Sequence, residues 1–333
     1  MPIHAALEDR LLRVREADGG WQAEETLVGH DFECLAADGD RIFAGTVEAG
    51  LQYSPDGGDT WHAVDFEDRV TSVTVGPDGT VWVGTEPSAV YRVPEDNLGA
   101  IEACADLTAL PSSGRWSFPP RPHTHHVRWV AVAPDDPDRL YVAIEAGAFV
   151  RSTDAGESWE PRPGGARRDN HTVATHPDAP ERVYVAAGDG YAESEDRGER
   201  WRYPQEGLEH RYVWGLAVDP GDPSRMLVSA ARGARSAHTP ANAEAYVYRR
   251  EVGGDGAGGG DSDGGAWQLA MDGLPDPEGT VRAVLAAGRP GEFYALTNRG
   301  LYRSGDAGRS WTGLPVEWPV TYTGQVGRGL AVV

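Results

Sequence analysis

Histidine is concentrated in one short stretch of this chain, where three of the four residues from 123 to 126 are His. Imidazole nitrogens are common ligands of divalent transition metals, so this residue type predicts a metal site as one chemistry. The metal candidates are His125, His126, His171 and His210. Their alternative roles are hydrogen bonding within loops and proton transfer.

Arginine is the second residue type that could do chemistry. A guanidinium group binds carboxylate or phosphate through two parallel hydrogen bonds, which suits an anionic ligand. Arg128, Arg282 and Arg328 are the main candidates. Alternatively, these arginines form ion pairs with acidic residues such as Glu33, Glu145 and Asp189.

A repeated motif indicates the framework that must position these side chains. Ser-x-Asp-x-Gly-x-x-Trp occurs four times, at Ser54–Trp61, Ser152–Trp159, Ser194–Trp201 and Ser304–Trp311, and each copy follows an alternating apolar run. Units of about 40 residues with several short strands are typical of β-propellers. The Asp accepts hydrogen bonds within a turn, the Gly permits a positive φ, and the Trp packs on the sheet.

The motif resembles the Asp-box, or BNR, repeat of sialidases, sortilin-type receptors, some xyloglucanases and photosystem II assembly factors. In those families the Asp box lies on a turn between the outer strands, away from the ligand face. The resemblance therefore implies that Asp56, Asp154, Asp196 and Asp306 are structural.

The repeat spacing predicts an all-β, seven-bladed propeller of four-stranded antiparallel blades that fills residues 1–333. Degenerate boxes account for two blades, around Tyr91–Asp96 and around Tyr246–Arg250 with Trp267. A damaged box at Arg15–Trp21 and the tail suggest a shared seventh blade, in which residues 319–333 join residues 2–27. Such a closure pairs otherwise open sheet edges. Insertions are expected at 108–124, 233–244 and 253–265.

In this architecture the loops that enter the innermost strands share one end of the ring with the loops between second and third strands. Seven of the ten histidines map to these loops. The inner strands are expected, for example, at Thr172–His176 and Val281–Ala286. Their alignment brings imidazole, guanidinium, carboxylate and aromatic groups to one opening of the central channel, here called the mouth, as in a binding pocket. The expected ligand-binding residues are Glu33, His126, Arg128, His171, Arg211, Tyr212, Trp214, Arg235, His238, Arg282 and Arg328.

Three functions follow from this mouth: a binding protein, a glycoside hydrolase or lyase for an anionic sugar, and a His-ligated metalloenzyme. The catalytic candidates are Glu145, His171 and Tyr212. The resemblance to sialidases implies an arginine triad with a Tyr nucleophile, which Arg128, Arg282, Arg328 and Tyr212 could imitate. The Arg-Ile-Pro segment typical of sialidases is missing, because Phe43 follows Arg41-Ile42.

The charge balance limits the partners. The chain has 30 arginines, no lysine and 52 acidic residues, which gives a net charge of −22. This composition resembles haloarchaeal proteins and predicts a surface hydrated at high salt; an acidic partner-binding face is the alternative. It argues against nucleic acid and anionic membranes as partners, and it favours a small anionic or carbohydrate ligand or a protein. The lack of a basic, apolar N-terminal stretch predicts a cytoplasmic protein.

Overall fold

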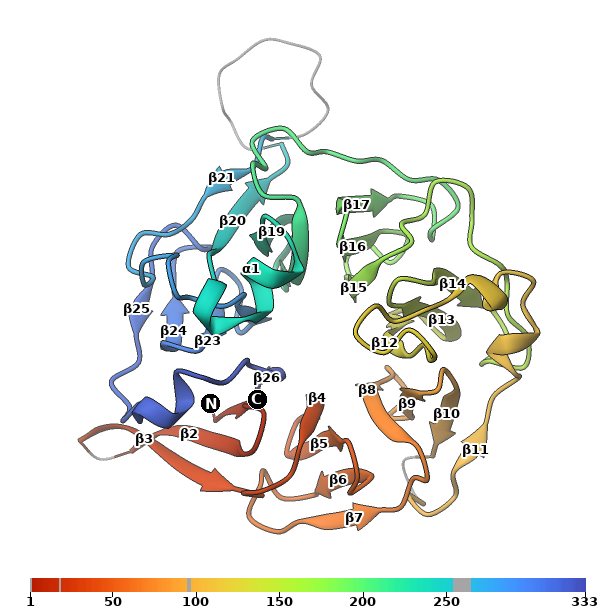
Figure 1. Cartoon of the computed structure of the whole chain (residues 1–333), viewed down its shortest axis with the longest axis horizontal. Coiled ribbons are helices and arrows are strands. Elements are labelled where there is room, and N and C mark those ends of the chain that lie inside the picture. The colour runs from red at the N-terminus through yellow and green to blue at the C-terminus, as the bar shows by residue number, and fades with distance from the viewer. Residues whose placement is uncertain (1, 18, 95–96, 254–264) are drawn as a thin grey trace.

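The alternating apolar runs form strands that assemble into a ring of seven sheets (Figure 1). The computed structural model describes residues 2–17, 19–94, 97–253 and 265–333. The first three sheets in chain order are β4 (Phe32–Asp38), β5 (Arg41–Thr46), β6 (Leu51–Ser54), β7 (His62–Val64); β8 (Arg69–Val75), β9 (Val81–Glu86), β10 (Val90–Val93), β11 (Glu102–Ala103); and β12 (Val127–Ala133), β13 (Asp136–Ile144), β14 (Ala148–Ser152). All strand pairs within these sheets are antiparallel.

The next three sheets are β15 (Asn170–Ala174), β16 (Val183–Ala187), β17 (Gly190–Ser194); β18 (Tyr212–Asp219), β19 (Asp222–Ala231), β20 (Ala245–Glu251), β21 (Gln268–Leu269); and β22 (Val284–Ala287), β23 (Phe293–Thr297), β24 (Gly300–Ser304), β25 (Thr312–Gly313). In the sheets of β12 and β15 the outer strand is reduced to one bridge, Arg151 with Glu160 and Glu193 with Arg202. Pro161 and Pro204 follow closely and lack the N–H that a longer ladder needs.

The seventh sheet joins both ends of the chain, as the sequence predicts. The order of its strands is β26 (Gly329–Val332), β1 (Ile3–Ala6), β2 (Leu11–Ala17) and β3 (Gly20–Thr26). Ile3 pairs with Val332 and Ala6 with Gly329 in an antiparallel register. The seven-bladed fold and its closure by exchange of a terminal strand are therefore confirmed.

The Asp boxes form the compact turns expected of them. In the first box the Asp56 carboxylate accepts hydrogen bonds from the backbone N–H of Thr60 at 2.8 Å and from its hydroxyl at 2.7 Å. The Gly58 N–H donates to the hydroxyl of Ser54 at 2.8 Å, and Gly58 has a φ of 91°. The Thr60 bonds outweigh burial and lower the pKa of Asp56 to about 2. This carboxylate is used within its own turn, so its role is structural.

Apolar side chains fill the spaces between neighbouring sheets. In one cluster Trp82 of β9, which is 1% exposed, packs with Val130 of β12 and Val142 of β13. The same cluster includes Leu107, just before the insertion 108–124, and Trp116 within it. The short helices here are η1 (Leu107–Ala109), at the start of the insertion, and η2 (Ser113–Arg115). This insertion is therefore anchored to the ring.

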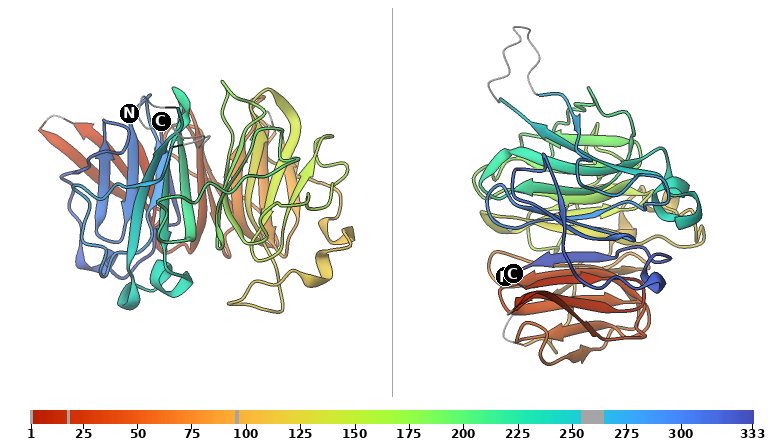
Figure 2. Two further views of the ribbon diagram at one scale, coloured as in Figure 1. Left: turned by 90° about the horizontal axis from the view of Figure 1, so that it is seen from above. Right: turned by 90° about the vertical axis from the view of Figure 1, so that its left-hand side faces the viewer.

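The insertion 233–244 contains α1 (Ala234–His238) and η3 (Pro240–Asn242), and η4 (Val320–Tyr322) precedes β26. Figure 2 shows α1 at one end of the ring and both chain termini at the other. Except for Gly253 and Gly265, the predicted insertion 253–265 lies outside the described residues, as do Asp18 of the damaged box and Glu95-Asp96 of a degenerate one. None of the described helices is both long and apolar enough to cross a membrane.

Two inner strands begin two or more residues away from their predicted starts. One is β15, which starts at Asn170 rather than Thr172. The other is β22, which starts at Val284 rather than Val281. The residues before β22 donate their N–H groups to the fifth blade: Arg282 to the Ala237 carbonyl of α1 at 2.9 Å and Ala283 to the Ser229 hydroxyl of β19 at 2.8 Å. The first of these bonds holds α1 against the end of the sixth blade.

Candidate functional site

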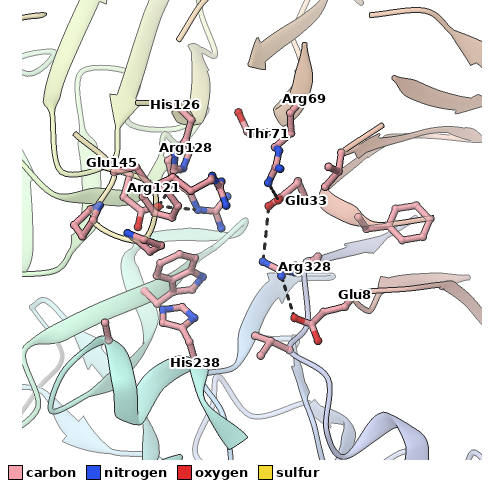
Figure 3. Close-up of a pocket in the computed structure, with 18 of the residues that line it drawn as sticks. Glu8, Glu33, Arg69, Thr71, Arg121, His126, Arg128, Glu145, His238 and Arg328 are labelled. Atoms are coloured by element: carbon pink, nitrogen blue, oxygen red, sulfur yellow. Dashed lines mark hydrogen bonds and ion pairs between the residues drawn. The ribbon is translucent and has the colours of Figure 1, made fainter. Parts of the chain in front are cut away.

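A cavity of about 890 Å³ lies at the end of the ring where the inner strands begin (Figure 3). Its walls come from separate blades, from α1 and from the insertion 108–124. Of the predicted site residues, those that line it are Glu33, His126, Arg128, Glu145, Tyr212, Trp214, Arg235, His238 and Arg328. A smaller cavity of about 60 Å³ shares Arg128, Trp214 and Arg328 with it, which places these three residues at the floor.

A β-bulge in each of five inner strands places one residue at the axis. The register between first and second strands skips one residue in each of these blades, and the skipped residues are Glu33, Thr71, Arg128, His171 and Trp214. A bulge leaves its extra residue out of the ladder and re-aims the side chain, and bulges are frequent beside functional sites. Four of these five residues line the cavity, and the fifth, His171, packs behind Trp214.

A second ring of side chains lies two residues earlier in the same strands or their approach. Asp31, Arg69, His126, Asp169 and Tyr212 each precede a bulge residue by two positions, and all five line the cavity. Because side chains of an extended chain alternate between two faces, positions two apart point to the same side. The sequence-based prediction missed Asp31, Arg69 and Asp169. A comparison of the residues two positions before each aligned inner-strand residue would have identified them. It also missed Glu8 and Arg121.

Trp214 is the centre of the floor. The guanidinium groups of Arg128 and Arg282 lie 4.6 and 4.7 Å from the centroid of its ring. The imidazoles of His171 and His238 have centroids 4.3 Å from it. Cations over an indole face are attracted by its quadrupole. One indole thus holds together four charged or titratable side chains from different blades.

Arg282 is buried behind this indole rather than in the cavity wall. It is 1% exposed, and neither its Nε nor its Nη1 donates to a described residue. Burial, followed by the neighbouring charges of Arg128 and Arg328, lowers the pKa of Arg282 well below its ordinary value. A buried guanidinium with free donors strengthens the positive potential of the floor.

Acidic side chains partly balance the arginines (Figure 3). Glu33 lies 3.2 Å from Arg69 and 3.8 Å from Arg328, and Arg328 also lies 3.0 Å from Glu8. Arg235, on α1, forms no ion pair with a described residue and is exposed. Ion pairing, one of the two expected roles of arginine, therefore occurs at the mouth, and the guanidinium of Arg235 has no ion pair with a described residue.

Glu145 is held as a carboxylate. Its Oε2 lies 3.2 Å from Nε2 of His126 and 3.8 Å from Nε of Arg128. Burial opposes its ionisation, but the hydrogen bond from His126 and the charge of Arg128 help to outweigh burial and lower the pKa of Glu145 to about 2. Such a group suits a cation ligand, whereas a proton-transfer group needs a pKa closer to the working pH.

Tyr212 and His238 form a half-buried pair, in which the phenol oxygen lies 3.2 Å from Nε2 of His238. Burial, with the charges of Arg282 and other cations, lowers the pKa of His238 to about 2. Burial and the charge of Glu145 raise the pKa of Tyr212. The neutral imidazole can therefore accept a hydrogen bond from the protonated phenol.

The remaining predicted residues lie elsewhere. His171 is fully buried behind Trp214 and beside Asp169. His125 packs against Trp116 with ring centroids 5.5 Å apart, and His210 stacks on Tyr246 at 4.0 Å. The structure does not bring the four metal candidates together, although His126 and His171 both lie close to Glu145.

Arg211 also lies outside the cavity. It lines a different hollow, together with Glu193 and Arg202. Its neighbour Tyr212 points into the mouth, as alternation along an extended segment requires.

The insertion 108–124 forms one wall. Arg121 donates from Nε to Glu86 at 2.7 Å and lies 4.7 Å from the centroid of the Phe118 ring. Phe118, Pro119 and Pro120 line the cavity beside it. This segment presents an apolar, aromatic surface opposite the charged floor.

Comparison with known proteins gives a likeness at the level of the fold. No protein-family model matches the chain, and no curated protein matches it significantly. Among solved structures, a GH74 enzyme from Niastella koreensis is similar with a TM-score of 0.67 at 14% identity, over 92% of this chain and 51% of that one. An ancestral GH74 enzyme is similar with a TM-score of 0.61 at 15% identity, over 83% of this chain and 36% of that one.

A structure of YCF48 bound to D1 peptide is similar with a TM-score of 0.57 at 16% identity, over 88% of this chain and 83% of that one. The chain therefore spans about a third to a half of the two GH74 structures and most of YCF48. At these identities the likeness shows a shared seven-bladed propeller architecture.

Proposed function

We propose that this propeller binds a small anionic ligand in the cavity at the mouth of its ring. The observation that carries the proposal is the convergence of bulge residues on a floor where Arg128 and Arg282 both lie on Trp214. Guanidinium donors suit the carboxylate or phosphate of a ligand, and an indole or phenyl face suits a sugar or other ring.

The size and the charges of the cavity support a small ligand. A volume of about 890 Å³ lies within the usual range of small-molecule pockets, roughly 300–1,000 Å³. Arg235 has no acidic partner among the described residues, so a ligand could bind its guanidinium without breaking an ion pair. A short acidic peptide segment would use the same donors, and YCF48 has been solved with a peptide bound.

The test is calorimetric titration of metal-free protein with galacturonate, citrate and inorganic phosphate, with neutral galactose as the reference ligand. We expect at least one anion to bind, and galactose to bind at least tenfold more weakly than that anion. The Arg235→Gln variant should lose at least fivefold in affinity for that anion.

The control is Arg15→Gln, which removes the same charge from an exposed side chain of β2. It should bind like the parent protein. Equal loss in both variants would mean that net charge, and not the cavity, drives binding. No binding of any anion to the parent protein would overturn the proposal.

A second candidate, an enzyme acting on an anionic sugar, is favoured by the Tyr212–His238 pair. The imidazole of His238 orients the Tyr212 phenol at the cavity, where the phenol oxygen can hydrogen-bond a bound sugar. Activity of the parent protein on chromogenic glycosides or on uronate polymers, abolished in Tyr212→Phe, would support this candidate. Unchanged activity in the variant would exclude Tyr212 as the reacting group.

A further inference from the structure

The fully buried ring of His171 faces two carboxylates. Its Nδ1 lies 2.7 Å from the backbone carbonyl of Val213. Since a carbonyl can only accept, Nδ1 carries the hydrogen, and in a neutral ring the lone pair is then on Nε2. Nε2 is buried and has no hydrogen-bond partner among the described residues.

The nearest acidic atom to this nitrogen belongs to Asp169, whose Oδ1 lies 3.7 Å away. A donor oxygen of Glu145 belongs to the same group, because the three donor atoms lie within 4.8 Å of one another. A nitrogen lone pair and two carboxylates repel each other at this range unless a cation lies between them. That cation is either a proton on Nε2 or a metal ion.

The burial of His171 distinguishes between a proton on Nε2 and a metal ion. The His171 side chain is completely shielded from water, which disfavours an imidazolium. A single proton would also leave one of the two carboxylates without a new partner, whereas a divalent ion can contact both. We propose that His171 Nε2, Glu145 and Asp169 bind a divalent transition metal ion at the wall of the cavity.

The surroundings of these donors resemble those of established metal ligands. A metal-bound histidine commonly donates its other ring N–H to a carbonyl, as His171 does to Val213. The Ala146 N–H donates to Asp169 Oδ1 at 2.9 Å, and His126 Nε2 lies 3.2 Å from Glu145. These partners fix the ligands in place, and they give His126 a positioning role.

The spacing requires only a small adjustment. Zn–N and Zn–O bonds of about 2.0–2.2 Å place neighbouring ligand atoms roughly 3–4 Å apart, so small rotations of the carboxylates complete the sphere. Arg128, 3.8 Å from Glu145, offsets part of the negative charge, and two carboxylates still exceed one guanidinium. Glu145 and Asp169 both line the cavity, so the remaining coordination positions face its interior.

This site differs from the four-histidine set that the sequence suggested, and it retains only His171 as a ligand. It is also independent of anion binding, because the metal is tested alone and the anion titration uses metal-free protein. Either proposal can therefore fail without the other.

The experiment titrates chelator-treated protein with CoCl₂ and separately with ZnCl₂, followed by calorimetry and by the visible spectrum of bound Co²⁺. We expect one ion to bind per chain, and we expect the visible spectrum to be that of Co²⁺ with nitrogen and oxygen ligands. Asp169→Asn should weaken binding at least tenfold, and it preserves an oxygen that accepts from Ala146. Glu145→Gln should act in the same direction.

The matched control is Asp189→Asn, the same substitution in the same blade, where Asp189 pairs with Arg167 and is half exposed. Its metal affinity should stay within twofold of the parent. Absence of stoichiometric Co²⁺ and Zn²⁺ binding in the parent protein overturns the proposal, as does equal affinity in Asp169→Asn. Nitrogen NMR that finds an imidazolium at His171 in the presence of excess Zn²⁺ also overturns it.

Discussion

The guanidinium of Arg282 lies 4.7 Å from the centroid of the Trp214 ring while only 1% of the residue is exposed. Two of its nitrogens have no partner among the described residues. Two further arginines, Arg128 and Arg328, contribute positive charge close by. A buried cation in this position costs stability and strengthens attraction for anions, so stability and binding should respond in opposite directions to its removal.

Arg282→Met should therefore stabilise the chain while it weakens anion binding. Methionine keeps an apolar side chain of similar length against Trp214 and removes the buried charge. We expect the free energy of unfolding to rise by about 1 kcal/mol in urea titrations. Affinity for the anion identified by calorimetry should fall about tenfold. A loss of stability would show that the buried charge is better compensated than its contacts indicate.

Trp311→Ala should have the reverse pattern. Trp311 belongs to the fourth Asp box, is 5% exposed, and donates from Nε1 to the Ala270 carbonyl at 3.0 Å. Truncation of a buried Trp costs about 3–5 kcal/mol, so the urea midpoint should drop sharply. Ligand affinity per folded molecule should not change, since the box lies at the opposite end of the ring. A comparable loss of affinity would contradict the division of the ring into a structural end and a binding end.

His4 should make stability depend on pH. It is fully buried in β1, and neither ring nitrogen has a described partner. Burial, aided by the charge of Arg13, lowers its pKa from 6.5 to about 4. The unfolded chain then binds more protons than the folded chain between these values, so stability is fully present above pH 6.5 and is lost as pH falls toward 4.

The expected loss attributable to His4 between pH 7 and pH 5 is about 2 kcal/mol. Urea titrations at both pH values should show this loss in the parent protein and a smaller one in His4→Met. Substitution of the exposed His62 to Met is the control and should leave the pH dependence as it is. Identical pH slopes in parent and His4→Met would mean that His4 is not held neutral by the fold.

Glu86→Gln should loosen the aromatic wall of the cavity. The Arg121–Glu86 hydrogen bond joins the insertion to the end of β9, and bonds to charged groups contribute about 1.5–3 kcal/mol. Amide exchange in the segment 118–124 should accelerate roughly tenfold, as measured by mass spectrometry. Glu102→Gln, which removes an exposed pair with Arg92, should leave this segment unchanged.

The fold was predictable because its signals are local. Each Asp box satisfies its own hydrogen bonds within a few residues, as Asp56 does with Thr60, so the motif has the same meaning wherever it occurs. The closure was predictable because the spacing of boxes across the two chain ends restores one period. The shortened outer strands were not predicted, because they depend on individual prolines such as Pro161 and the spacing of the repeats carries no information about them.

The site was predictable only to the level of its location. Alignment of inner strands identified the column of bulge residues, but it could not separate side chains that face the cavity from those that pack behind it. His171 turns its ring to the Val213 carbonyl of the next blade, and His210 stacks on Tyr246. The first contact depends on the neighbouring blade and the second on the packing of the loop before β18 against β20 of the same blade, and the repeat spacing encodes neither.

The exchange of a terminal strand has a practical consequence. Val333 donates its N–H to the Pro2 carbonyl at 3.1 Å, so the two chain ends are neighbours, at the end of the ring opposite α1. A surface tether or fluorophore attached to either one would leave the mouth free for ligand. A donor dye and an acceptor dye at these two positions would report directly on the separation of β26 from β1. They would therefore distinguish unfolding that begins with separation of these two strands from unfolding that proceeds one blade at a time.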